Sequence, residues 1–470
     1  MDPADWGVAE AAAHLVDGDL SALEYAQLLL DRVEKHRRGH AFITVRPSAL
    51  LDAARQADTA RRRGDALGPL HGVPLAIKDN IDTADLPTTG GTPALRDHRP
   101  AADARVVHRL RAAGALILGK ANLHELAYGM TGANACFGPI VNPYGRDRIA
   151  GGSSGGTAAA VAARLTPAGL GTDTGGSVRI PASLCGVVGL RPTVGRYSRD
   201  GLIVLSSTRD TAGPLARSVD DVRLIDAVLA GLPEPSTPAV AFGRLGVVRK
   251  PFATGLAPDL EACFQRRLAQ LDAAGFELVE FDFPPSLEDL IVEAGFPIAF
   301  YETPRELGRY LRDSGTGISV RELVDQCAGT DVREILTGLL GARAISADDY
   351  RLAMSRFRPE LDALVRKSFR DHRLDALIWP TTPLTAAPIG AEQVELGGRS
   401  TSAFLAYSRT TNLGSILGWP GVSVPGGQDD AGLPIGIALD GLPGTDHQLL
   451  RIARVCEDLF GPLPAPRERR

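Results

Sequence analysis

Disulfide, zinc and membrane features are all missing from this chain of 470 residues. Its five cysteines are odd in number and widely spaced, and they form no C-x-x-C pair. This pattern argues against a disulfide framework or a zinc site and indicates a reducing compartment. The N-terminal residues are acidic where a signal peptide needs basic ones, and no apolar run approaches a membrane span. We therefore expect a cytoplasmic protein.

An excess of charge of either sign is also missing. The net charge is −5 and both signs are spread along the chain, so neither a nucleic-acid partner nor a membrane surface is indicated. The nine histidines form no H-E-x-x-H or similar spacing, which gives a metal hydrolase no support. A hydrophobic content of 44% and a charged content of 23% are instead typical of a soluble globular protein.

Lysine is scarce, because only five of the 51 basic residues are lysines. The chain uses arginine wherever a positive charge alone is needed, so a lysine in an apolar setting can have a different role. Lys78 ends the apolar run Val73–Ile77. A buried, neutral lysine can act as a base, whereas a salt bridge to the adjacent Asp79 would keep it charged. The residues alone leave both interpretations open.

Glycine and hydroxyl side chains are concentrated in residues 148–193, where large side chains are few. Glycines bracket Ser153 and Ser154 on both sides, and two more glycines precede Ser177. Glycine lets backbone N–H groups approach a ligand closely. Two glycine-framed serines that face one another would provide a nucleophile and a ring of amide donors. A flexible linker is disfavoured, because a small-residue helix and a buried strand are predicted within the same stretch.

Two further motifs have structural interpretations. Gly114–Ala121 comes within one residue of a phosphate-binding P-loop, but Ala121 cannot bind magnesium and a strand is predicted where the loop should be. Gly152–Gly156 matches the G-x-S-x-G nucleophile elbow, with Ser154 at its centre. That elbow must directly follow a strand, whereas the preceding residues are typical of a loop. His447, the candidate histidine for such a triad, lies at the start of an ordinary predicted helix.

Apolar runs between turn residues predict strands at 73–77, 115–118, 187–190, 245–248, 276–283, 375–379, 421–424 and 435–439. Helices are predicted near 21–33, 50–62, 103–113, 122–128, 158–165, 218–229, 260–273 and 447–459, and residues 287–371 are helical and charged. The capping box at Ser21 and Glu24 begins the first of these helices. Strands that alternate with helices predict an α/β fold with a mixed, mostly parallel sheet covered by helices on both faces.

We expect one α/β core interrupted by a helical insertion, rather than separate domains in series. The expected parts are an N-terminal helical layer (1–64), a core (65–240), an α/β continuation with the helical insertion (241–374), and C-terminal strands and a helix that complete the core (375–470).

Three separated blocks together resemble the amidase signature family. They are VPLAIKDNID around Lys78, GGSSGGTAAAVAA around Ser153, and GLGTDTGGSVRIPASLCGVVGLRPTVGR around Ser177. The resemblance is dense over residues 65–230 and looser in the C-terminal strands. Within the family, scaffold segments are most similar to the branch of indoleacetamide and mandelamide hydrolases. One departure is Arg191, where the family commonly has lysine.

The resemblance implies a catalytic triad and an acyl-enzyme mechanism without metal or organic cofactor. Ser177 would be the nucleophile, Ser153 the bridging serine and Lys78 the terminal base. Backbone N–H groups from Thr174 to Ser177 would stabilise the oxyanion. The oxyanion and substrate-binding residues expected in this way are Thr174, Gly175, Gly176, Gly129 and Met130. Further pocket walls are expected from Thr131, Phe137 and Trp379–Thr382.

The expected substrate is a small, aryl-bearing amide. An anilide or carbamate hydrolase would use the same chemistry. Another alternative is the glutaminase subunit of a tRNA-dependent amidotransferase, which would need partner proteins. A non-catalytic scaffold is disfavoured by the complete Lys-Ser-Ser set. No nucleic-acid or membrane partner is expected, and the expected assembly is a homodimer.

Overall fold

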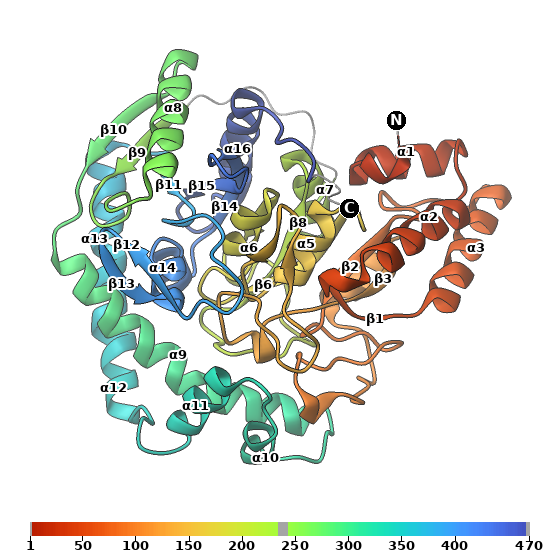
Figure 1. Cartoon of the computed structure of the whole chain (residues 1–470), viewed down its shortest axis with the longest axis horizontal. Coiled ribbons are helices and arrows are strands. Elements are labelled where there is room, and N and C mark those ends of the chain that lie inside the picture. Colours follow the sequence, from red (N-terminus) through yellow and green to blue (C-terminus); the bar gives the residue numbers. More distant parts are fainter. Residues whose placement is uncertain (1, 234–242, 467–470) are drawn as a thin grey trace.

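The computed structural model describes residues 2–233 and 243–466. One sheet of eleven strands runs through the molecule, in the order β1-β3-β2-β6-β8-β7-β14-β15-β11-β9-β10. Helices α5 and α6 pack on one face of this sheet, and α7, α8 and α16 pack on the other (Figure 1). The predicted α/β class, with a mixed sheet covered on both faces, is therefore confirmed.

The strands of the large sheet are β1 (Phe42–Val45), β2 (Pro74–Lys78), β3 (Leu116–Ala121), β6 (Ala168–Asp173), β7 (Val188–Arg191), β8 (Thr211–Ala216), β9 (Arg244–Val248), β10 (Glu277–Phe281), β11 (Ala376–Pro380), β14 (Gly421–Gln428) and β15 (Pro434–Asp440). Two small sheets pair β4 (Val141–Asn142) with β5 (Gly145–Ile149), and β12 (Gln393–Leu396) with β13 (Arg399–Ser402).

The α-helices are α1 (Val8–Asp17), α2 (Ala22–Lys35), α3 (Pro47–Arg63), α4 (Arg105–Ala112), α5 (Gly155–Ala162), α6 (Arg179–Cys185), α7 (Val219–Ala230), α8 (Pro258–Ala274), α9 (Ser286–Asp313), α10 (Val320–Asp325), α11 (Thr330–Leu339), α12 (Ala347–Leu352), α13 (Arg358–His372), α14 (Ala403–Ser408), α15 (Asn412–Leu417) and α16 (Asp446–Phe460). Within the described residues, none of these helices is both long and apolar enough to cross a bilayer.

Strand direction changes along the sheet. Pairing is parallel in β3-β2-β6 and in β11-β9-β10, and antiparallel between the other neighbours. The parallel pairing predicted from the alternation of strands and helices is thus found in these two blocks. Strands β14 and β15 are joined by residues 429–433, a link too short for a crossover, and they form a hairpin.

The individually predicted helices are present with ends within three residues of the prediction, with one exception. The capping box is present, because Ser21 Oγ accepts from Glu24 N and Glu24 accepts from Ser21 N. The helix predicted over 122–128 is wrong, since only a 3₁₀ turn forms at Glu125–Ala127. Leu126 has a φ of 51° and its N–H donates to the carbonyl of Gly90. This tertiary hydrogen bond takes the backbone donor that a continuing helix would need.

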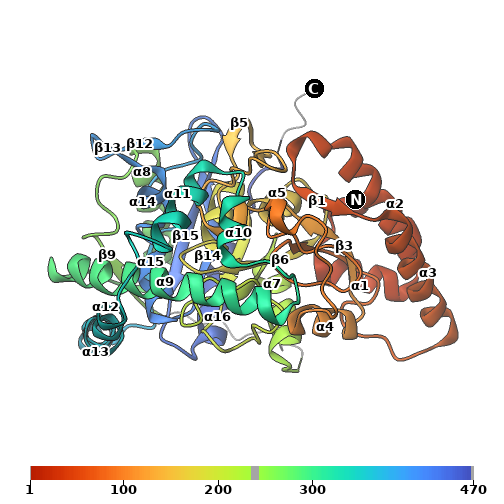
Figure 2. The same cartoon turned by 90° about the horizontal axis from the view of Figure 1, so that it is seen from below.

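The segment interpreted from the sequence as a helical insertion lies between β10 and β11 and consists of α9 to α13. Helices α9, α10 and α11 lie along one side of the core, below the sheet in Figure 1 and across its front in Figure 2. The N-terminal helices α1 to α3 form the opposite end of the molecule from α12 and α13 in both views. The insertion therefore lies beside the C-terminal ends of β2 and β6, where the predicted site residues are located.

Candidate active site

Lys78 is the last residue of β2, and its side chain is fully buried. Its Nζ donates to Ser153 Oγ and to Thr172 Oγ1, both at 2.7 Å. The adjacent Asp79 forms its ion pair with Lys120 instead, at 3.1 Å. The interpretation of Lys78 as a salt-bridge partner of Asp79 is therefore wrong, and the alternative of a buried, neutral lysine remains.

The protonation state of Lys78 follows from its surroundings. Burial lowers the pKa of its ammonium group to about 7, although the carboxylates of Asp173 and Asp210 act in the opposite direction. A lysine in water has a pKa of about 10.4 and is charged at neutral pH. In this site a large fraction of Lys78 is neutral near pH 7, so its nitrogen can accept a proton from Ser153.

The segments that carry the two glycine-framed serines lie against each other. The peptide bond between Gly152 and Ser153 is cis. Ser154 N donates to the carbonyl of Ser177 at 3.0 Å, which joins the two segments at their backbones. Ser153 is fully buried, whereas Ser177 lines a cavity. The two glycine-framed segments are thus in contact through Ser154 and Ser177.

The nucleophile-elbow alternative does not fit these contacts. Ser154 Oγ donates to the carbonyl of Thr172 at 3.1 Å and accepts from its N–H at 3.2 Å. Ser154 therefore fastens α5 to the end of β6, with its hydroxyl used in both directions. His447 is exposed at the start of α16, where its Nε2 lies 3.3 Å from Arg196 Nη2.

Asp173, at the end of β6, holds the loop that leads to Ser177. It is fully buried and accepts from the N–H groups of Gly176 at 2.9 Å and Val178 at 3.2 Å. Burial alone would raise the pKa of its carboxyl group, but Arg179 and Arg191 outweigh that effect and hold the pKa well below the usual range. The loop is therefore fixed by a permanently charged carboxylate.

The prediction that the Gly176 N–H is an oxyanion donor is wrong. The N–H of Gly176 is committed to Asp173 Oδ1, so it is not free to bind a substrate oxygen. In the part of the chain that the structure describes, the N–H groups of Thr174, Gly175 and Ser177 donate to no protein acceptor. Gly176 instead has a steric role, because its φ is 124° and an added Cβ would lie 2.2 Å from Thr411 Oγ1.

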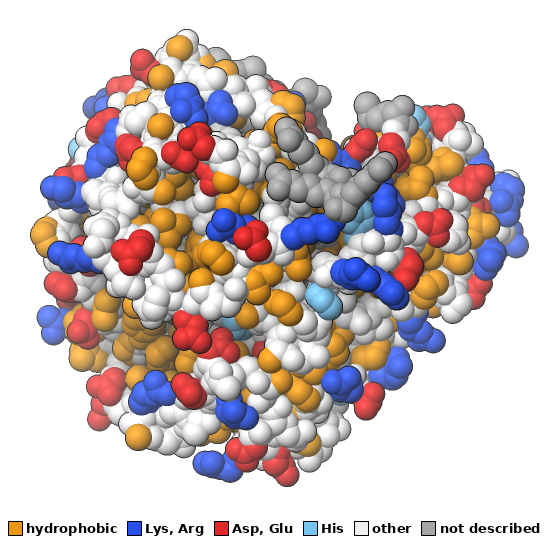
Figure 3. Space-filling model, viewed as in Figure 1, with side chains coloured by type: hydrophobic (Ala, Val, Ile, Leu, Met, Phe, Trp, Pro, Cys, Tyr) orange, Lys and Arg blue, Asp and Glu red, His pale blue; other side chains and the backbone are white. Residues whose placement is uncertain are grey.

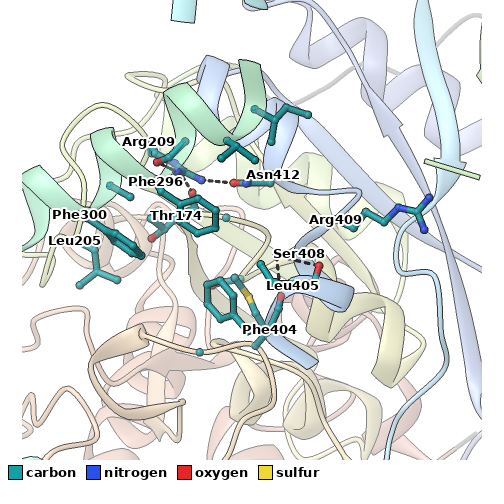
Figure 4. A pocket seen from close by; sticks show the side chains of 18 of the residues that line it. Thr174, Leu205, Arg209, Phe296, Phe300, Phe404, Leu405, Ser408, Arg409 and Asn412 are labelled. Atoms are coloured by element: carbon teal, nitrogen blue, oxygen red, sulfur yellow. Dashed lines mark hydrogen bonds between the residues drawn. The ribbon is translucent and has the colours of Figure 1, made fainter. Parts of the chain in front are cut away.

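Ser177 lines a cavity of about 300 Å³. Figure 4 shows other side chains of its wall, among them Thr174 and Phe296. The expected binding residues that line the cavity are Gly129, Met130, Thr174, Gly175 and Ser177. The other predicted wall residues, Thr131, Phe137 and Trp379–Thr382, are not among its lining residues. Trp379 is fully buried in β11 and packs against Phe252, with ring centroids 4.8 Å apart, so it belongs to the core.

Much of the cavity wall comes from α9 and α14, which carry no sequence motif. The large apolar and aromatic side chains of the wall include Leu205, Phe252, Ile291, Val292, Phe296, Phe300, Phe404 and Leu405. Phe296 and Phe300 lie one turn apart on α9, with ring centroids at 5.4 Å. Sequence analysis missed these residues, because an apolar i, i+4 pair on a helix is more often part of a core.

The arginines of the cavity are held by acceptors of the protein. Arg209 donates to the carbonyls of Thr174 at 3.1 Å and Gly295 at 3.0 Å, and to Asn412 Oδ1 at 2.5 Å (Figure 4). Burial lowers the pKa of Arg209 to about 10. Arg409 likewise donates to the carbonyls of Pro251 and Thr254. Arg209 thus connects the loop of Ser177 to α9 and α15.

The mouth of the cavity is largely apolar, although the exposed carboxylate of Glu288 also lines it. Val292 on α9 and Leu405 on α14 line the cavity and are 53% and 50% exposed. Figure 3 shows a hollow with hydrophobic side chains at the lower left, over the region where Figure 1 places α14 and α9. A ligand that enters here meets apolar surface before it reaches Ser177.

The P-loop-like stretch is structural, as its sequence suggested. Lys120 lies within β3, is fully buried, and donates to Thr88 Oγ1 at 2.7 Å in addition to its ion pair with Asp79. Backbone groups of a strand pair with neighbouring strands and are not available to cradle a phosphate. Among the described residues, no group of three or more His, Cys, Asp or Glu side chains has a metal-binding arrangement.

Comparison with known proteins extends over nearly the whole chain. The family described as Amidase matches residues 24–450. The indoleacetamide hydrolase of Agrobacterium vitis is 41% identical over 452 residues, which cover 96% of each chain. The mandelamide hydrolase of Pseudomonas putida is 38% identical, over 97% of this chain and 92% of its own. The solved structure of native peptide amidase from Stenotrophomonas maltophilia has a TM-score of 0.86 at 32% identity, over 99% of both chains.

Proposed function

This chain belongs to the amidase family, and we propose that it hydrolyses small aryl-bearing amides through Ser177, Ser153 and Lys78. It is an amidohydrolase close to the indoleacetamide and mandelamide hydrolases. One observation carries the proposed mechanism: the buried Lys78, with its pKa near 7, is hydrogen-bonded to Ser153 beside the cavity that Ser177 lines.

The proposed reaction begins with a proton relay. Neutral Lys78 takes the proton of Ser153, which takes the proton of Ser177 as the Ser177 oxygen attacks the amide carbonyl. The tetrahedral intermediate then collapses, and Ser153 gives a proton to the leaving nitrogen while the Lys78 ammonium restores the proton of Ser153. Water releases the acyl group from Ser177 by the same relay, which returns all three residues to their starting state.

We further propose that the N–H groups of Gly175 and Ser177, with Thr174, stabilise the oxyanion. Among the described residues these three N–H groups have no protein acceptor, and Asp173 holds their loop in place through the N–H of Gly176. A preorganised donor of this kind contributes roughly 3–4 kcal/mol to transition-state stabilisation. Donors that are already held in place add no reorganisation free energy to the barrier of the reaction.

The cavity supports an aryl-bearing acyl group. Phe296, Phe300 and Phe404 present aromatic surface next to the loop of Ser177, and aromatic rings pack favourably edge to face. Each Å² of apolar ligand surface that is removed from water contributes about 25 cal/mol to the gross free energy of binding. An anilide or a carbamate with the same aryl group would use the same relay, so the assay compares all three C–N substrates.

The cavity argues against glutamine as the substrate. Free glutamine carries an ammonium and a carboxylate group, which need charged partners when they are taken from water. Arg209 and Arg409 are already bound to main-chain carbonyls, the carboxylate of Glu288 lies at an exposed position of the wall, and the other walls are largely apolar. We therefore favour a stand-alone amidase over the glutaminase subunit of a tRNA-dependent amidotransferase.

The test is the activity of the purified chain, without partner proteins, on phenylacetamide, an anilide, an alkyl carbamate and glutamine. We expect turnover of the aryl amide, its loss in Ser177→Ala, and no ammonia release from glutamine. Glutamine turnover, or activity only after a partner chain is added, would overturn the proposal. The mass of the active species in solution tests the expected homodimer in the same samples.

A further inference from the structure

We propose that His124 is a positioning residue of the active site, which holds the loop Gly129–Thr131 and the main chain of Ser153 from the helical insertion. The inference rests on the proposed function, because it concerns the same site. It gives the insertion, which carries no chemical motif, a specific task in catalysis.

His124 contacts three parts of the molecule at once. Its backbone N–H donates to the carbonyl of Ser153 at 3.2 Å. Its side chain is only 3% exposed, with Nδ1 3.4 Å from Thr131 Oγ1 and Nε2 3.0 Å from Asp331 Oδ2. His124 therefore joins the serine segment through its backbone, and the loop 129–131 and the start of α11 through its buried ring.

The ring of His124 leaves no space beside Gly129. A Cβ added at Gly129 would lie 2.3 Å from both Nε2 and Cε1 of the ring. On its other side, the carbonyl of Gly129 lies 2.9 Å from where a Cβ of Gly152 would be. Gly129 is thus enclosed between the ring and the residue that precedes Ser153. A shift of the ring would move the cavity wall and the relay together.

The insertion sets the orientation of this ring. Asp331 lies in the first turn of α11, and its side chain is 58% exposed. Glu125, next to His124, fixes the same end of α11 by accepting from the N–H groups of Ala328 at 3.0 Å and Gly329 at 2.6 Å. Because Asp331 reaches the ring from an exposed position, its removal loosens the ring without opening the core.

The first experiment compares Asp331→Ala with Glu334→Ala, a control on an exposed position one turn along the same helix. Misplacement of reacting groups by a distant change can cost about a hundredfold, and we expect kcat to fall about tenfold in Asp331→Ala. The melting temperature and the KM for phenylacetamide should change little, and the control should match the wild type. Unchanged kcat in Asp331→Ala would overturn the proposal.

The second experiment tests the contact between the ring and Gly129. Gly129→Ala should lower kcat, because its methyl group takes the place of the ring. The double variant Gly129→Ala/His124→Ala should be no less active than His124→Ala alone, since the clash is then absent. Effects that multiply, as for independent sites, would overturn the proposal. His124→Gln keeps a donor for Asp331 and should recover part of the activity lost in His124→Ala.

Failure of this inference and failure of the proposed function give different results. An inactive wild type, or an active Ser177→Ala variant, would refute the proposed function whatever the His124 variants do. A wild type that depends on Ser177 but is insensitive to Asp331→Ala and Gly129→Ala would refute only the role of His124.

Discussion

Asp79 follows Lys78 in the chain, yet its ion pair is with Lys120, at a distance of 3.1 Å. The pair lies in the core, where both side chains are fully buried, and Thr89 and Thr88 complete its hydrogen bonds. Lys120 thereby supplies the positive charge that Asp79 requires. Lys78 is left with hydroxyl partners, which suit a neutral amine as well as a charged one.

The first prediction concerns the pH dependence of the rate. Because the pKa of Lys78 is lowered to about 7, the neutral base is the minor form below that pH and the major form above it. We expect kcat/KM for an aryl amide to rise about tenfold per pH unit below the pKa and to level off above it. A profile that falls as the pH rises from about 6 to about 8 would contradict a neutral lysine base.

The second prediction concerns the charge of Lys78. Lys78→Arg keeps a positive charge, but a guanidinium cannot act as a neutral base in a protein. We expect kcat to fall by about 10²–10⁴-fold, close to the value for Lys78→Ala. Thermal melts of both variants control for folding. Near wild-type activity of Lys78→Arg would show that only a charge is needed at this position.

The third prediction separates Ser154 from the reaction. Ser154→Ala removes the acceptor of the Thr172 N–H and should lower the free energy of unfolding by about 1–3 kcal/mol. Its turnover should persist, because the hydroxyl is used for structure. His447→Ala should also keep kcat, since His447 is exposed and bound to Arg196. Loss of kcat by more than about a hundredfold in either variant would support the nucleophile elbow.

The sequence was informative where function depends on the backbone. Glycines around Ser153 and Ser177 indicate close backbone approaches, and a lysine at the end of an apolar strand indicates burial. The assignment of all three residues to one site came from the family resemblance. The side chains of the cavity could not be predicted, because Phe296 and Phe404 differ from core residues only in what the tertiary fold leaves beside them. Trp379 shows the reverse case, since it was expected in the cavity wall and lies in the core.

The strand directions and the free oxyanion donors were equally beyond local signals. Alternation of strands and helices is typical of parallel pairing, but short links such as 429–433 allow hairpins within the same sheet. The commitment of the Gly176 N–H to Asp173 depends on where that buried carboxylate points. Sequence spacing alone does not fix that direction.

The fourth prediction concerns Arg191, where the family resemblance led us to expect lysine. Its guanidinium is fully buried and donates to the carbonyls of Asp173, Arg209 and Trp419, and to the Asp173 carboxylate. Lysine presents its donors from one nitrogen and cannot reach all of these acceptors. Arg191→Lys should lower the free energy of unfolding by about 1–3 kcal/mol. Denaturant unfolding with an unchanged midpoint would contradict this.

The most direct test of the account is the site of covalent attachment. A serine-reactive acylating or phosphonylating probe should add one label to the wild-type chain, and peptide mapping should place it on Ser177. The label should be absent from Ser177→Ala and slow to form in Lys78→Arg, because the relay activates that oxygen. A label on Ser154, or one that forms equally fast without Lys78, would contradict the proposed relay.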